Sequence, residues 1–150
     1  MSLLVRTNST NKDFVSLVKL LDQDLKFRDG EEHLFHAQYN KIDHIHHVVV
    51  AYKNQVAVGC GAIKHFDDTT AEVKRMFVSP DCRGEGIATK ILNALEHWAR
   101  ELNYEATVLE TGVKYPEAIA LYQKHGYIPI PRYGQYEQVL SSRCFRKKLD

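Results

Sequence analysis

A strand, a glycine-containing turn and an amphipathic helix follow one another between residues 73 and 95, and this order constrains the fold most. Residues 73–78 form a short apolar run, interrupted by two cations, that is typical of a strand. Ser79-Pro80-Asp81 predicts its end, because proline donates no hydrogen bond to a sheet. The helix that follows has an apolar stripe made of Ile87, Ile91, Leu95, Trp98 and Leu102.

The turn between this strand and this helix has the composition of an anion-binding site. The first N–H groups of a helix have no internal partner and carry the positive end of its dipole. Gly84 and Gly86 would let a phosphate approach the backbone without meeting a Cβ, and Arg83 adds a positive charge. The same glycines could serve only the geometry of a turn, so their spacing alone leaves both interpretations open.

The residues of the turn also carry a resemblance to a known family. Residues 83–88, R-G-E-G-I-A, fit the pattern (Arg/Gln)-x-x-Gly-x-(Gly/Ala) and follow the strand end M-F-V-S-P. This stretch resembles the coenzyme A diphosphate loop of the GNAT N-acetyltransferases. Residues 116–127, P-E-A-I-A-L-Y-Q-K-H-G-Y, resemble the later helix and following strand of that family. Both stretches occur in the family's order, and the resemblance extends from about residue 45 to the C-terminus.

The patterning of the whole chain predicts a mixed sheet flanked by helices. A helix should begin at a cap formed by Thr10 or Asn11 and run to about Phe27, and a second, short one is expected over residues 31–40. A strand over residues 106–110 follows a helical crossover and should therefore lie parallel to the strand over 71–78. The other expected strands cover residues 3–6, 44–51, 56–64, 127–130 and 142–149.

With the resemblance, this pattern implies the GNAT acyl-CoA N-acyltransferase fold. That fold is an α/β (α+β) architecture with a central, mostly antiparallel sheet, one parallel pair of strands that splay apart, and flanking helices. A chain of 150 residues is long enough for one domain with its own core, so we predict a single GNAT domain over residues 1–150.

Composition excludes several classes of partner. The chain has 20 basic and 19 acidic residues, which argues against nucleic acid or a membrane surface as the main partner. No apolar run approaches the ~20 residues of a membrane span. Cys60, Cys82 and Cys144 are odd in number and far apart, which indicates reduced thiols and a cytoplasmic protein. Family members are often dimers, so a homodimer is an expectation that the resemblance adds.

The resemblance assigns residues to acetyl-CoA. Main-chain groups of Met76, Phe77 and Val78 would pair with the pantetheine arm, and an N–H at the end of this strand would stabilise the oxyanion. The loop and the first helical turn would hold the diphosphate, through Arg83, Gly84, Glu85, Gly86, Ile87, Ala88 and Thr89. Many members contact the coenzyme through an asparagine at the start of the later helix. Here that region contains no asparagine, and Lys114 or Tyr115 would have to replace it.

Three residues are candidates for the chemistry of acyl transfer. Tyr122 matches the family tyrosine that faces the coenzyme sulfur, and a phenol of pKa about 10 can protonate a leaving thiolate. Glu110 and Glu72 are carboxylates on the two central strands, and either could act as a base or hold the substrate's ammonium group. A lysine-like amine of pKa about 10.4 is mostly protonated at neutral pH and needs such help.

The acceptor pocket should be built from the least family-like parts of the chain, residues 28–39 and 132–136. Arg75, Tyr133 and Tyr136 are candidates to hold a small polar amine, and Arg75 in the cleft would favour an amino acid or another carboxylate-bearing amine. Five histidines, at positions 33, 36, 44, 46 and 47, lie near one another in the sequence. They lack cysteines or carboxylates at a recognisable ligand spacing, so no metal site is expected.

The sequence therefore predicts an acetyl-CoA-dependent N-acetyltransferase that acts on a small-molecule amine by direct transfer in a ternary complex. A protein or peptide N-acetyltransferase is an alternative, and so is a non-catalytic acyl-CoA-binding regulator on the same fold. A dinucleotide-binding oxidoreductase fits less well, because the glycine turn follows an antiparallel meander and lacks a third glycine.

Overall fold

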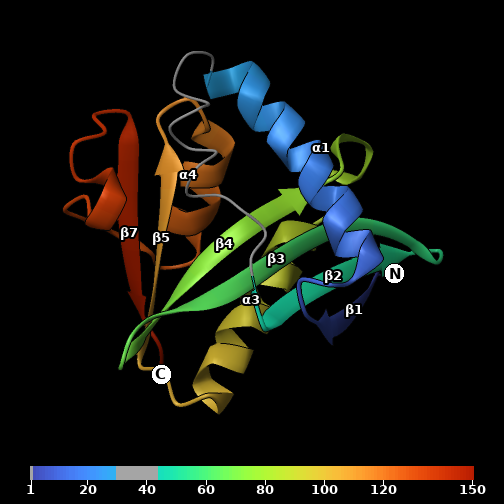
Figure 1. Ribbon diagram of the computed structural model, residues 1–150, viewed down its shortest axis with the longest axis horizontal. Coiled ribbons are helices and arrows are strands. Elements are labelled where there is room, and N and C mark those ends of the chain that lie inside the picture. Colours follow the sequence, from blue (N-terminus) through green and yellow to red (C-terminus); the bar gives the residue numbers. More distant parts are fainter. Residues whose placement is uncertain (1, 30–43) are drawn as a thin grey trace.

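The computed structural model describes residues 2–29 and 44–150, and in this part of the chain seven strands form a single mixed sheet with helices on both faces (Figure 1). The strand order is β1-β2-β3-β4-β5-β7-β6, and only β4 and β5 pair in parallel among the described strands. The predicted mixed sheet with one parallel pair is confirmed. The strands are β1 (Ser2–Thr7), β2 (His47–Lys53), β3 (Val56–Asp67), β4 (Thr70–Val78), β5 (Ala106–Gly112), β6 (Ile128–Ile130) and β7 (Ser142–Lys148).

Helix α1 (Lys12–Asp29) covers one face of the sheet. Of the two predicted caps, Asn11 is the one used, since its Oδ1 accepts a hydrogen bond of 2.9 Å from the N–H of Phe14. Leu17 and Val18 are buried with Phe14 against β2 and β3, in the periodicity expected of an amphipathic helix. The short helix predicted over residues 31–40 lies outside the described residues.

Helices α3 (Ile87–Glu101) and α4 (Pro116–Lys124) cover the opposite face (Figure 1). Ile87, Ile91 and Leu95 are buried there, as their spacing predicts. Leu102 does not belong to this buried stripe, because α3 ends one residue earlier and its side chain is 37% exposed. No helix in residues 2–29 and 44–150 is both long and apolar enough to cross a bilayer.

The parallel pair is joined over only part of its length. Thr70, Ala71 and Glu72 of β4 pair with residues 106–108 of β5, and beyond this point the two strands have no common hydrogen bonds. Figure 1 shows them starting side by side and diverging toward their C-terminal ends. The outer strands β3 and β7 stay paired with β4 and β5, so the divergence opens a gap inside the sheet. This is the splay that the family resemblance implied.

A β-bulge in β4 shapes one wall of this gap. Cys60 of β3 pairs with Phe77 and Ala62 with Lys74, so β4 has one residue more than β3 between these pairs. Arg75, within this interval, has a positive φ of 61°. Gly61 of β3 lets the Met76 side chain pack closely against it, since a Cβ at Gly61 would lie 2.6 Å from the Met76 sulfur.

Candidate active site

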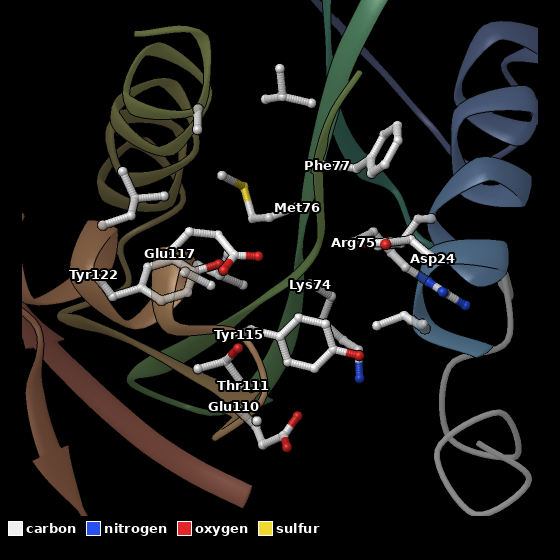
Figure 2. Close-up of a pocket in the computed structure, with 18 of the residues that line it drawn as sticks. Asp24, Lys74, Arg75, Met76, Phe77, Glu110, Thr111, Tyr115, Glu117 and Tyr122 are labelled. Carbon is white, nitrogen blue, oxygen red and sulfur yellow. The ribbon is translucent and has the colours of Figure 1, made fainter. Parts of the chain in front are cut away.

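A cavity of about 460 Å³ occupies the gap between β4 and β5 (Figure 2). Its walls come from the second half of β4, the loop before α3, the end of β5, α4 and the C-terminal half of α1. Ligands in open α/β sheets lie beyond the carboxyl ends of parallel strands, and this cavity is in that place. Met76, Phe77 and Val78, the residues predicted to follow the pantetheine arm, all line it.

The loop before α3 presents main-chain N–H groups to one end of the cavity. Gly84 and Gly86 adopt left-handed conformations, with φ of 80° and 81°, that other residues rarely adopt. Gly86 caps α3, and no side chain of the described residues caps this helix end. A Cβ at either glycine would project into open space. These are the features of a helix N-terminus that can accept a phosphate.

Arg83 ties this loop to the end of β4. Its Nε donates a hydrogen bond of 2.9 Å to the carbonyl oxygen of Val78, and its guanidinium lies 5.7 Å from the centre of the Phe77 ring. The side chain of Glu85, in contrast, does not line the cavity and pairs with Lys53 at 2.6 Å. Glu85 therefore offers a ligand only its main chain.

Thr89 lies in the first turn of α3 and lines the same end of the cavity. Its Oγ1 is 3.0 Å from Nε2 of His125, at the C-terminal end of α4. This contact connects the two helices that share this face of the sheet. The sequence motif contains Thr89 but says nothing of His125, since only the packing of α3 on α4 brings the two together.

Tyr122 of α4 is 94% buried and lines the cavity between the two strands (Figure 2). Its ring contacts that of Tyr127, with centroids 5.7 Å apart. Burial raises the pKa of the Tyr122 phenol well above its ordinary value, and the negative charge of Glu110 adds to this effect. The phenol is thus held protonated at neutral pH, the state that a proton donor requires.

Glu110 stands near the end of β5 and lines the cavity. Its Oε2 accepts a hydrogen bond of 2.7 Å from Oγ of Ser142, the facing strand's first residue. Glu72 lines the cavity as well, so the structure brings the predicted acid and both predicted carboxylates into one cavity.

Glu72, the other carboxylate, lies at the point where β4 and β5 separate and is 92% buried. Its Oε2 accepts a hydrogen bond of 2.7 Å from the hydroxyl of Tyr133. Burial and the Glu72 charge together raise the pKa of the Tyr133 phenol. Tyr133 is not among the residues that line the cavity, so it supports Glu72 from behind, whereas Tyr136 reaches the cavity wall and packs on the Tyr133 ring.

Arg75 extends from the bulge toward α1, on the same side of β4 as Phe77, and Met76 extends to the other side (Figure 2). Its side chain is 3% exposed, and its Nη1 donates a hydrogen bond of 3.0 Å to Asp22 of α1. In the described part of the chain, its buried Nε and Nη2 have no hydrogen-bond partner. Arg75 also lines the cavity, as its predicted role in substrate binding requires.

Lys74 is a cavity residue that was not predicted from the sequence. Its side chain is 11% exposed, and its ammonium lies 4.0 Å from Oε1 of Glu72. Burial lowers the pKa of Lys74, and the Glu72 charge opposes that shift. The sequence did contain a signal for it, because Lys74 and Arg75 are adjacent cations in an otherwise apolar strand. A buried strand seldom carries a charged residue without a partner.

An ion pair joins helices α1 and α4 beside the cavity. Arg28 forms an ion pair with Glu117 at the start of α4, and its guanidinium stacks 5.0 Å from the centre of the Tyr115 ring. Tyr115 lines the cavity, at the position where the family asparagine is missing. Arg28 belongs to the first predicted acceptor segment, residues 28–39, of which residues 30–39 lie outside the described part of the chain.

No group of three potential metal ligands occurs among the described residues. His33 and His36 lie outside these residues, and His47 packs edge-on against Trp98, on the α3 side of the sheet.

Burial raises the pKa of the Cys60 thiol to about 12, and this thiol donates a hydrogen bond to the carbonyl oxygen of Arg75. Cys60 is therefore an inert core residue.

The sequence profile of the acetyltransferase (GNAT) family matches residues 14–127, which is most of the chain. The chain belongs to the GNAT family. Among GNAT relatives, an IAA acetyltransferase of Azospirillum brasilense is 42% identical over 89 residues, 59% of this chain and 58% of that protein. An aminoalkylphosphonate N-acetyltransferase of Salmonella typhimurium is 30% identical over 129 residues, 81% of this chain and 80% of that protein.

Solved structures of GNAT proteins share the whole architecture. A Klebsiella pneumoniae structure assigned as an acyl-CoA N-acyltransferase superposes with a TM-score of 0.81 at 29% identity, covering 100% of this chain and 99% of that one. A Thermoplasma acidophilum N-acetyltransferase in complex with coenzyme A superposes with a TM-score of 0.73 at 14% identity over 99% of both chains. The GNAT fold predicted from the sequence is confirmed.

Proposed function

We propose that this GNAT protein transfers the acetyl group of acetyl-CoA to the amine of a small molecule, directly and within a ternary complex. The observation that carries this proposal is the placing of Tyr122 and Glu110 in one cavity, between splayed strands and beside an uncapped helix N-terminus. The two relatives are named as acetyltransferases, which supports an enzyme over a non-catalytic acyl-CoA-binding regulator.

The cavity fits the coenzyme in three respects. The open space above Gly84 and Gly86 admits the diphosphate to the main-chain N–H groups of α3. Beyond Glu72, β4 and β5 no longer pair, which leaves main-chain groups of β4 on that side for the pantetheine arm. Bound there, the coenzyme supplies an activated acetyl group.

Two residues of the chain then carry out the proton transfers of the reaction. Glu110 accepts a proton from the acceptor amine, directly or through water, so that the nitrogen lone pair can form the new C–N bond. Tyr122 donates its phenolic proton to the sulfur as the C–S bond breaks. The second proton of the attacking nitrogen, which the amide does not keep, returns to the phenolate directly or through water, and Glu110 releases its proton to solvent. The products are an N-acetylated amine and the free thiol. We propose Glu110 over Glu72 as the base, because Glu72 is buried and accepts a hydrogen bond from the Tyr133 phenol, whereas Glu110 is only half-buried, near the end of β5.

Thiol release from acetyl-CoA, measured with a panel of amines, tests this function. The panel contains free amino acids, aminophosphonates, polyamines and peptides, and we expect turnover with one of the small amines. Turnover with peptides alone would indicate a protein or peptide N-acetyltransferase. Tight binding of acetyl-CoA without turnover of any amine would indicate the regulator.

A further inference from the structure

Lys74 and Arg75 form a pair of cations on one wall of the cavity. Side chains of a regular strand alternate between its faces, so neighbours normally point apart. The bulge at this point of β4 breaks the alternation, and Arg75 reaches α1, whereas Val73 and Val78 pack with α3 on the other face. Lys74 is near Glu72, which precedes it by two residues and shares its face.

Among the residues that the structure describes, the positive charges of this pair are incompletely neutralised. The Lys74 ammonium is farther from Glu72 than a hydrogen bond allows. Arg75 uses one nitrogen on Asp22, and two further buried nitrogens have no partner in the described part of the chain. Buried cations are normally paired and hydrogen-bonded, because an unpaired buried charge is costly. The wall therefore has capacity for an anion that the described residues do not supply.

The coenzyme does not supply this anion when it binds as proposed. Lys74 precedes the end of β4 by four residues, roughly 13 Å at about 3.3 Å per residue. The diphosphate would lie beyond that end, at Gly84 and Gly86, and the pantetheine arm between carries no charge. The anion that meets Lys74 has to arrive with the other substrate.

We infer that Lys74 and Arg75 form an anion-binding subsite for the acceptor, so that the amine acetylated here carries a carboxylate or phosphonate a few bonds from its nitrogen. The inference rests on the proposed function and specifies its substrate. Glu110 on the opposite strand receives the amine end, so the two walls of the cavity suit the two ends of a short zwitterion. The cavity also has to hold the thioester end of the coenzyme, which restricts the acceptor to a small molecule.

Matched amines test the subsite in the intact protein. We expect kcat/KM for 2-aminoethylphosphonate or 3-aminopropanoate to exceed that for 3-aminopropanol at least about tenfold, the usual worth of one charge-assisted contact. The ratio between phosphonate and carboxylate identifies the preferred anion. Equal rates for the charged and neutral amines would overturn the inference and leave the proposed function intact.

A charge-removing variant assigns the preference to Lys74. Lys74→Met keeps the length of the side chain and should raise KM for the anionic amines about tenfold, with KM for 3-aminopropanol and acetyl-CoA changed less than about twofold. Lys74→Arg should keep most of the preference. Lys19→Met, at an exposed position of α1, is the matched control and should change none of these values. An equal loss with all amines in Lys74→Met would contradict the inference.

A binding measurement separates the two proposals. Methylphosphonate and propanoate are titrated calorimetrically into the protein saturated with coenzyme A, where no chemistry occurs. Binding that disappears in Lys74→Met supports the subsite, and absence of binding in the wild type overturns it. Binding without turnover of any amine would overturn the proposed function, and with it the assignment of this anion to an acceptor.

Discussion

The two ends of the cavity are built from different parts of the polypeptide. At the α3 end, main-chain N–H groups and two left-handed glycines face the space, and the side chain of Glu85 points elsewhere. At the other end, charged side chains from β4 and β5 line the walls, and those of Glu72 and Arg75 are buried. Main-chain N–H groups can bind a ligand group that many enzymes share, such as a diphosphate, and a short sequence motif is enough to specify their geometry. A ligand group that differs from enzyme to enzyme has to be bound by side chains, whose positions depend on the fold.

Tyr122 stands where the two ends meet, and removing its hydroxyl should have the largest effect. We expect Tyr122→Phe to lower kcat by about 10²–10⁴-fold, the usual contribution of a positioned acid, with little change in acetyl-CoA affinity. Because burial and Glu110 raise the pKa of the phenol, wild-type kcat should not fall through its ionisation below about pH 10. Single-turnover thiol release, measured across pH, gives the rate constant of the chemical step in the variant and its pH dependence in the wild type.

The control for this variant is Tyr127→Phe. The Tyr127 ring contacts that of Tyr122, but the Tyr127 hydroxyl donates a hydrogen bond to the buried Glu96, away from the cavity. It should lose about 1–3 kcal/mol of stability in denaturant unfolding and keep its kcat. Full kcat in Tyr122→Phe would remove the proton donor from the mechanism.

The two carboxylates should respond differently, which sharpens the contrast between the strands. We expect Glu110→Gln to lower kcat/KM about 10²-fold at neutral pH, as loss of a general base does. The defect should shrink as pH rises toward the amine's pKa of about 10, because the neutral amine then forms without help. Glu72→Gln should act mainly on KM or stability, since Glu72 is held by Tyr133.

The pH dependence of kcat/KM for both variants decides between them. A larger loss in kcat with Glu72→Gln, relieved at high pH, would assign the base to β4 instead of β5. If the pH profiles of kcat/KM of both variants matched the wild-type profile, the amine would have to be deprotonated before it binds.

The smallest effect is expected at the backbone-built end. Gly86→Ala places a Cβ on a residue with φ of 81°, a conformation that costs about 1–2 kcal/mol. The loop relieves this strain by shifting its N–H groups, so the Kd of acetyl-CoA should rise about tenfold, with kcat little changed. Calorimetric titration measures it.

Gly126→Ala is the control for backbone strain alone. Gly126 has φ of 88° and follows α4, outside the cavity lining. It should lose stability and keep the affinity for acetyl-CoA. Equal losses of affinity in both variants would mean that the α3 loop has no special part in binding the coenzyme.

Local patterns in the sequence determined much of this protein. The apolar spacing of α1 and α3, the Asn11 cap and the glycine loop all depend on neighbours in the chain, so they were predictable. The family resemblance added the splayed pair β4 and β5 and the position of Tyr122.

Only the tertiary structure decided how the charged end of the cavity is arranged. The bulge that brings Lys74 beside Arg75 depends on the register between β3 and β4, and Tyr133 reaches Glu72 from 61 residues away. Such contacts join residues remote in sequence, and their burial follows from packing instead of residue type. A motif can therefore specify a backbone-built site, whereas a site of buried charges exists only when the sheet has brought its walls together.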